Sequence, residues 1–209
     1  MKRHVAVAVF ALLAFVPLLA QVPKGWMLRT DRSTSASDPD APGTVKLVPM
    51  GSGFRAISPQ AAVFWNPANT ASGNYSLKAT FTLIKSTGYL EYYGLLLGGS
   101  NLEAAGQDYL YFVITDDGTW LIKRRTGPTT QELSAKTPSA AVKKPAADGT
   151  CTNALEIRVM ADKIDFVING MVVKTVPKTG LAAKTDGVYG LRINHHLEVQ
   201  VDRLGISKL

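Results

Sequence analysis

Short runs in which apolar and polar residues alternate follow one another along most of this chain. In Tyr75–Leu83, Tyr, Leu, Ala and Phe alternate with Ser, Lys and Thr, the period-two pattern of a strand with one buried face. After Gln21, no stretch of about a dozen residues combines the helical period with helix caps. We therefore predict an all-β fold, a two-sheet antiparallel β-sandwich of the jelly-roll kind. The other predicted strands are Trp26–Arg29, Val45–Val48, Phe54–Ile57, Leu90–Leu97, Tyr109–Thr115, Thr119–Arg125, Ala154–Ala161, Lys163–Asn169, Met171–Val176, Gly187–Ile193 and Leu197–Ile206.

Two hairpins can be placed in register from their turns. Asp116-Asp117-Gly118 is a three-residue turn with glycine where φ must be positive, and Asn169-Gly170 is the preferred pair for a tight turn. The first turn sets a register that leaves one face apolar and places two tyrosines beside two cations on the other. A slip by one residue would mix these faces. The predicted pairs are Ile114 with Trp120 and Phe112 with Ile122 on the apolar face, and Tyr111 with Lys123 and Tyr109 with Arg125 on the other.

The N-terminal residues have the pattern of a secretory signal. A basic start, Met1–His4, precedes the uncharged apolar run Val5–Val16, and Pro17 and the small residue Ala20 follow. The apolar run is shorter than the roughly 20 residues that span a membrane. We therefore expect cleavage after Ala20, no membrane span, and a single β-sandwich domain over residues 21–209. Such a protein would be secreted or periplasmic.

The cysteine count and the distribution of charge limit the disulfides and the partners that this protein can have. Cys151 is the only cysteine, so no internal disulfide forms and the fold depends on packing. The formal net charge is +7, and the segment Lys123–Lys144 contains six basic residues and one acidic residue, Glu132. Such a segment can attract polyanions, or it can be an ordinary solvated loop. No helical basic stripe or RNA-binding signature is present, so nucleic acid is not a predicted partner.

The second half of the chain resembles a known superfamily. Leu155–Val159, Ile164–Gly170, Gly187–Arg192 and Val199–Asp202 are similar to the closing half of concanavalin A-like lectin/glucanase domains. These include laminin-G-like modules and domains related to 3-keto-disaccharide hydrolases. The resemblance implies two stacked, curved sheets whose concave face often holds carbohydrate. By analogy with the family, calcium could bind through main-chain and carboxylate oxygens, but no acidic loop of this chain supports such a site.

The acidic residues do not follow the catalytic pattern of that superfamily. Its glucanases carry a strand of the form Glu-x-Asp-x-x-Glu, and no such strand occurs here. Glycoside hydrolysis needs two carboxyl groups at a defined separation. Glu156 and Asp165 alternate with core residues and are predicted to lie on a solvated face, whereas Asp116-Asp117 belongs to a turn. Glu91 is the one acidic residue that remains a weak candidate for catalysis, so whether the protein is an enzyme stays open, with a non-enzyme favoured.

The adjacent pair His195-His196 lies between two predicted strands. Neighbouring residues of a strand point to opposite faces, and zinc needs three or four ligands with suitable spacing. We therefore predict a turn at this pair rather than a metal site. No metal and no other cofactor is predicted from the residues.

The remaining hypothesis is a face that binds a ligand. Sugars are held by aromatic rings and by hydrogen bonds from fixed polar groups. Strand parity places tyrosines and cations on one face, which could equally be a convex, solvated surface. Trp65 is expected to be a core residue rather than a stacking platform. The predicted site residues are Glu91, Tyr93, Tyr109, Tyr111, Lys123, Arg125, Arg192, Asn194 and His196.

Three functional classes therefore remain. The first is an exported, non-catalytic carbohydrate-binding or cell-surface module, whose partner would be a glycan or polysaccharide, acidic if the basic segment takes part. The second is a glycan-active enzyme, a glycoside hydrolase related to the 3-keto-disaccharide hydrolases, with Glu91 or a histidine as the acid–base group. The third is a structural protein without a small ligand.

Overall fold

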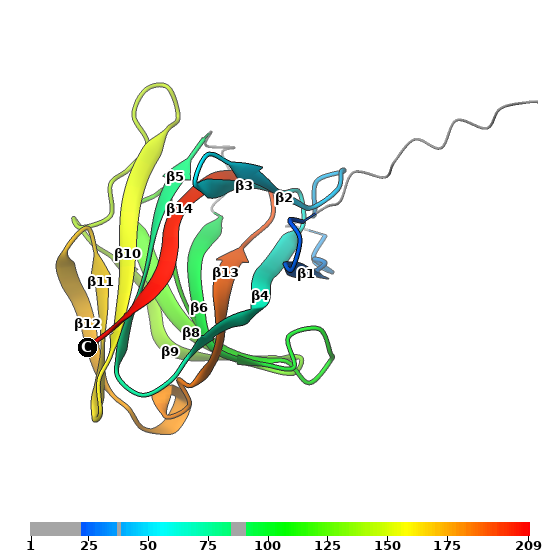
Figure 1. Ribbon diagram of the computed structural model, residues 1–209. Helices are drawn as coiled ribbons and strands as arrows, with labels where there is room; N and C mark the ends of the chain where they lie inside the picture. The colour runs from blue at the N-terminus through cyan, green and yellow to red at the C-terminus, as the bar shows by residue number, and fades with distance from the viewer. Residues whose placement is uncertain (1–21, 37–38, 85–90) are drawn as a thin grey trace, which may run out of the picture.

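The strands form two seven-stranded sheets packed face to face (Figure 1). A computed structural model describes residues 22–36, 39–84 and 91–209. Every strand pair is antiparallel. Sheet A has the order β1 (Met27–Asp31), β4 (Ala61–Ala71), β13 (Gly187–Ile193), β6 (Tyr92–Ser100), β7 (Asp108–Thr115), β8 (Thr119–Thr126), β9 (Thr129–Pro138). Sheet B has the order β12 (Met171–Pro177), β11 (Lys163–Ile168), β10 (Cys151–Val159), β5 (Tyr75–Leu83), β14 (Leu197–Lys208), β3 (Gly53–Ser58), β2 (Lys46–Met50).

The predicted all-β sandwich is confirmed, and two strands were missed. The helical element of the described residues is one 3-10 turn, η1 (Gly180–Ala182). Strand β4 contains Asn66-Pro67, a pair that is typical of turns, but the chain continues in extended form through it. Strand β9 is mostly exposed and lies at the edge of sheet A, so it has little of the alternation that marks a half-buried strand. No helix of the described residues is long and apolar enough to cross a membrane.

The register predicted for the first hairpin is confirmed. Ile114 pairs with Trp120 and Phe112 with Ile122, and all four side chains lie in the core between the sheets. Across the other face, the tyrosines of β7 pair with cations of β8 as predicted: Tyr111 with Lys123 and Tyr109 with Arg125. The second hairpin turns at Asn169-Gly170, where both residues have positive φ, as the tight turn requires.

Strand β6 corrects one predicted site residue. Tyr93 is fully buried in the core, and its hydroxyl lies 3.7 Å from Sγ of Cys151. Leu95 and Leu97 point to the same side, so the alternation of β6 sends Leu96 outward instead. The expectation that Tyr93 belongs to an outer binding face is therefore wrong. Cys151 is a buried residue whose thiol pKa is raised by burial, which fits a structural rather than a reactive cysteine.

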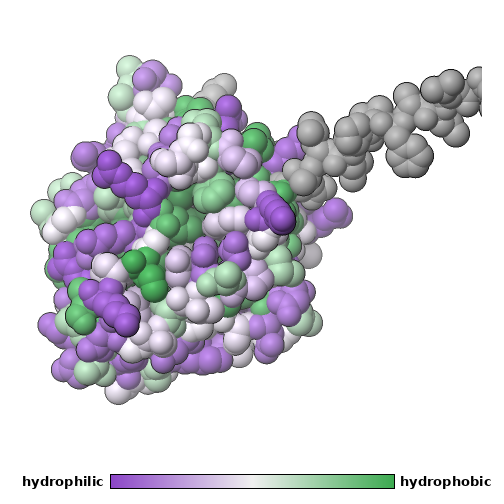
Figure 2. Space-filling view, viewed as in Figure 1, coloured by the Kyte–Doolittle hydropathy of each residue, from purple (hydrophilic) through white to green (hydrophobic). Residues whose placement is uncertain are grey.

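The outer face of sheet B is polar and solvated. In Figure 2, viewed as in Figure 1 with strands of both sheets in sight, hydrophilic and neutral residues cover most of the surface around a hydrophobic area near the middle. Glu156 lies 2.8 Å from Arg158 and 3.2 Å from Lys78, as expected for a charged pair on a solvated face. Partial burial alone would raise the pKa of Glu156, but hydrogen bonds from Arg158, Ser76 and Lys78 lower it to about 2. Asp165 accepts a hydrogen bond from Thr175, so both acids lie where the alternation placed them.

Candidate functional site

The outer face of sheet A differs from that of sheet B because it carries aromatic and apolar side chains. Its apolar cluster contains Val63, Trp65, Leu96, Leu102 and Tyr109. We call this surface the tyrosine face and define it by Trp65, Tyr109, Tyr111, Lys123, Arg125 and Arg192.

This face is covered in part by its own loops. Val63 and Leu96 are completely buried although they lie outside the core between the sheets. Leu102, from the loop after β6, packs on the cluster, and Arg29 of β1 donates a hydrogen bond to the carbonyl of Ala104 in the same loop. Beside Trp65 the loop leaves a hollow of about 240 Å³. The loop after β6 therefore covers part of this face and leaves a recess beside Trp65.

Tyr109 and Tyr111 form the aromatic centre of the face. They lie two residues apart on β7, and their ring centroids are 5.7 Å apart. Tyr109 is only 1% exposed, whereas Tyr111 is half-buried. Burial raises the pKa of both phenols, that of Tyr111 to about 12. Both hydroxyls therefore stay protonated at neutral pH and can donate hydrogen bonds.

Arg192 sits beside this pair and is held by an acidic residue that sequence reasoning missed. Its Nη1 donates a 2.5 Å hydrogen bond to Oδ2 of Asp31 on β1, and the two side chains are only 11% and 12% exposed. Burial alone would lower the pKa of Arg192, but the nearby Tyr109, Asp31 and Tyr111 raise it. Within the described residues, the buried Nε of Arg192 has no hydrogen-bond acceptor. Arg192 is thus a fixed cation at the base of the face, and its unused Nε donor is buried.

The other cations of the face are also engaged by the protein. Nε of Arg125 donates to the carbonyl of Gly127 at 2.7 Å, and Nζ of Lys123 lies 3.7 Å from Glu132. Arg29 lies 3.8 Å from Asp31. Each of these cations contacts a carboxylate or a carbonyl oxygen, and Asp31 and Glu132 offset part of the positive charge of Arg29, Lys123, Arg125 and Arg192.

The basic segment Lys123–Lys144 does not form one continuous patch. Arg124 points to the opposite side of β8, is 6% exposed, and lies 2.8 Å from Asp108. It also donates hydrogen bonds to the carbonyls of Leu181 and Lys184, which fasten the η1 region to sheet A. Lys136 pairs with Asp117 at 2.8 Å. The alternation of β8 and the edge strand β9 therefore divides the segment between two faces and several ion pairs.

Two predicted site residues, Glu91 and His196, lie away from the tyrosine face, at one end of the sandwich. Glu91 immediately precedes β6 on the side of Tyr93, so it points toward the buried end of the core, where it is 4% exposed. His196 lies in the predicted turn between β13 and β14, with φ of +59°, and its Nε2 donates to the carbonyl of Pro39. Asn194 follows β13, and its main-chain N–H donates to Tyr92. The structure therefore does not place Glu91 or His196 on the same surface as Tyr111.

Glu91 instead belongs to a buried cluster around His195. Oε1 of Glu91 is 3.2 Å from Nε2 of His195, and Oδ1 of Asp40 is 3.3 Å from Nδ1 of the same ring. With side-chain exposures of 4% and 5%, Glu91 and His195 leave too little surface for a substrate to reach. The arrangement joins the start of β6, the β13–β14 turn and the segment before β2. We therefore interpret this cluster as a set of contacts that holds these three segments together.

The described residues contain no group of three or more His, Cys, Asp or Glu side chains that could hold a metal ion.

No described strand of sheet A carries two alternating carboxylates: its acidic residues are Asp31, Asp108 and Glu132, each on a different strand. Asp31 is bound by Arg192, and Asp108 by Arg124 and Lys184. The tyrosine face thus has the aromatic and hydrogen-bonding groups of a binding surface, without a free carboxylate pair for hydrolysis.

No known protein family matches the sequence, and no curated protein matches it. Solved structures do. The carbohydrate-binding module CBM66 from Bacillus subtilis is 8% identical with a TM-score of 0.61, and the match covers 88% of this chain and 96% of the module. A glycoside hydrolase family 16 endo-glucanase from Bacteroides ovatus is 12% identical with a TM-score of 0.57, covering 87% and 94%. The chain has the concanavalin A-like lectin/glucanase fold.

A further concanavalin A-like neighbour is a Bacillus subtilis protein of unknown function with a galectin-like fold. It is 12% identical with a TM-score of 0.60, and the match covers 88% of this chain and 90% of that one. The concanavalin A-like fold is thus shared by binding modules and by glucan-cleaving enzymes. At these identities the likeness shows the fold alone, so the site residues have to decide between the two.

Proposed function

We propose that this protein is an exported, non-catalytic carbohydrate-binding module that holds its ligand on the tyrosine face. The observation that carries the proposal is the partly exposed ring of Tyr111 beside the buried pair of Arg192 and Asp31. An aromatic ring offers a flat apolar surface on which a sugar ring can stack. Fixed polar groups around such a ring can direct hydrogen bonds to sugar hydroxyls.

The contrast between the two outer faces supports this placement. The outer face of sheet B carries small hydroxyl residues and charge pairs, for example Thr80, Thr82 and Thr152 around one shallow hollow. The tyrosine face has two tyrosines, the buried ion pair of Arg192 and Asp31, and a recess beside Trp65. Ligand sites are mostly apolar and have a few fixed polar groups, so the aromatic and apolar lining of the tyrosine face fits such a site better than the polar lining of the hollow on sheet B.

The contacts that the cations of the tyrosine face already make favour a neutral glycan over an acidic one. Arg192, Lys123 and Arg125 each already contact a carboxylate or carbonyl oxygen of the protein. An anionic polymer would have to compete with these contacts, whereas sugar hydroxyls can use the donors that remain. Binding to a neutral glycan should change little with salt, because few counterions are released.

Replacing Tyr111 by alanine tests the proposal directly. A glycan array identifies the ligand, and its dissociation constant is then measured by calorimetry for the protein and the variant at low and high salt. Loss of the ring should cost about 1–3 kcal/mol of binding free energy, the scale of one buried aromatic side chain, or a roughly 5- to 150-fold weaker Kd. The melting temperature should change little, because the core residues Phe112 and Ile122 point to the other side of their strands.

Two controls sharpen this experiment. Tyr111→Phe keeps the ring and removes the hydroxyl, so it separates stacking from hydrogen bonding. Thr152→Ala alters the outer face of sheet B and should leave binding unchanged. If Tyr111→Ala binds as well as the unchanged protein, the glycan lies elsewhere. If no glycan on the array binds, a structural protein without a small ligand becomes the better description.

Export is part of the same proposal and is tested separately. The basic start, the apolar run and the small residue Ala20 support cleavage after that residue. The intact mass of protein recovered outside the cytoplasm should correspond to a chain beginning at Gln21. A mass that includes residues 1–20 would contradict cleavage at Ala20.

A further inference from the structure

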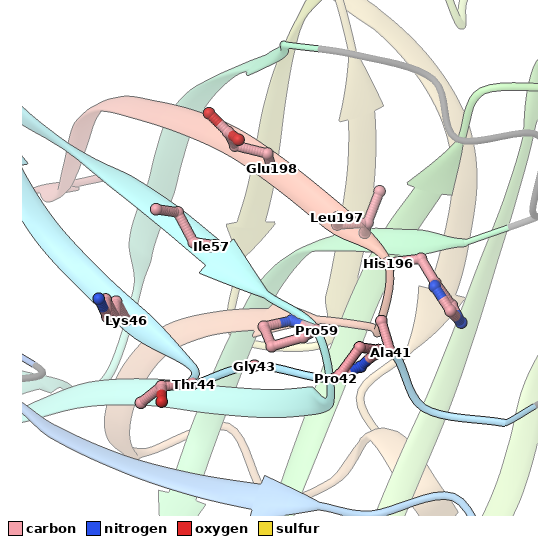
Figure 3. A pocket seen from close by; sticks show the side chains of 10 residues that line it. All are labelled: Ala41, Pro42, Gly43, Thr44, Lys46, Ile57, Pro59, His196, Leu197 and Glu198. Carbon is pink, nitrogen blue, oxygen red and sulfur yellow. The ribbon is translucent and has the colours of Figure 1, made fainter.

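A second hollow lies at the end of sheet B, where it is bounded by residues 41–44, β2, β3 and the start of β14 (Figure 3). Its volume of about 510 Å³ is within the range of small-molecule sites. Ala41, Pro42, Ile57, Pro59 and Leu197 supply apolar groups to its lining. None of its lining residues belongs to the tyrosine face, so the hollow is a separate site.

The wall of this hollow is held in place by contacts at both of its sides. The main-chain N–H of Ala41 donates to the carbonyl of Pro59 at 3.0 Å. The two residues before it, Pro39 and Asp40, contact the β13–β14 turn: the carbonyl of Pro39 is 2.7 Å from Nε2 of His196, and Asp40 lies 3.3 Å from the buried His195. The hollow is therefore formed before any ligand arrives, which removes part of the entropic cost of binding.

The charged groups of the hollow are not equivalent. Lys46, Ile57 and Glu198 lie side by side in one row across β2, β3 and β14. Glu198 forms an ion pair with Arg55 on the neighbouring row, so its charge is offset by the protein. Among the described residues, Lys46 has no carboxylate partner, and its side chain lines the hollow (Figure 3). The apolar side chains of the hollow therefore lie next to one ammonium group, that of Lys46, whose charge is not offset by a described carboxylate.

We propose that this hollow binds a small amphipathic carboxylate. The apolar part of the ligand lies against Ile57, Pro59 and Leu197, and its carboxylate faces Lys46. The apolar floor supplies most of the attraction, because removal of apolar surface from water is the main driving force for such ligands. Lys46 supplies the preference for an anion over a neutral or cationic molecule of the same shape.

Hexanoate, hexanol and hexylammonium are matched probes for this site, since they share the alkyl chain and differ in the charge of the head group. Each is titrated into isotopically labelled protein at low salt and followed by backbone amide NMR. All shifts should centre on the residues around Ile57 and Leu197. Hexanoate should bind up to about fivefold more tightly than hexanol, the scale of one exposed ion pair, and hexylammonium more weakly than hexanol. This preference should shrink in high salt.

Two variants decide whether the assignment is correct. Lys46→Gln, a change at an exposed position, should remove the preference for hexanoate while leaving hexanol binding unchanged. Ile57→Ala should weaken all three probes, with melting curves confirming that the variant is folded. Tyr111→Ala should not alter hexanoate binding, so failure here is distinct from failure of the glycan proposal. Equal affinity for the three probes, shifts spread over the whole surface, or a preference that survives in Lys46→Gln would overturn the proposal.

Discussion

Replacing Trp120 by alanine is expected to lower the free energy of unfolding by about 3–5 kcal/mol, the range for large aromatic residues lost from a core. Trp120 is 3% exposed and packs edge-on against Phe112 at a ring-centroid distance of 6.2 Å. Phe112 in turn contacts Phe166 of sheet B at 5.1 Å, so the cavity would open at the contact between the two sheets. For a chain of this length, each kcal/mol shifts the melting temperature by about 2–4 °C.

The measurement is chemical denaturation of the purified protein and its variants, with the same slope against denaturant required of each. Trp26→Ala is a matched control, because Trp26 is only partly buried and packs against Phe54 at the margin of the core. It should cost clearly less than Trp120→Ala. Trp120→Ala should leave glycan affinity unchanged as long as the protein is folded. If Tyr111→Ala unfolds the protein and Trp120→Ala does not, the faces of sheet A have been assigned the wrong way round.

Replacing Asp31 by alanine should lower the free energy of unfolding by about 3–5 kcal/mol, because it leaves the Arg192 guanidinium buried without its counter-ion. Arg192 and Asp31 are both nearly inaccessible, and their contact joins β1 to β13 across the strand that separates them. Since Arg192 borders Tyr111, glycan affinity should fall together with stability in this variant. Thermal and denaturant unfolding measure the loss of stability, and calorimetry with the glycan identified on the array measures the loss of affinity.

A double variant separates the lost charge pair from lost packing. Asp31→Leu combined with Arg192→Met removes both charges and keeps apolar volume, so it should be more stable than either single change. Lys136→Ala is the exposed control: its pair with Asp117 is more than one-third accessible, and its loss should cost less than about 1 kcal/mol. A single Asp31→Ala variant as stable as the unchanged protein would show that the pair does not carry a buried charge.

Features that depend on near neighbours in the chain were predictable from the sequence. Alternation in Tyr75–Leu83 and Gly187–Ile193 placed both strands at their observed bounds. The turn at Asp116–Gly118 set the register of β7 and β8, because a short turn leaves the following residues only one pairing that keeps the apolar face together. That register was enough to place Tyr111 and Lys123 on one side and Trp120 on the other.

Features that depend on the order of strands in a sheet were decided by the tertiary structure alone. Asp31 meets Arg192 across 161 positions of the chain because β4 lies between β1 and β13, and no local pattern encodes that order. Trp65 is buried, as expected, but in the cluster on the outer side of sheet A and not between the sheets, and Glu91 lies at the buried end beside His195. Alternation along a strand gives two faces, but only the packing of the second sheet determines which of them is the inside.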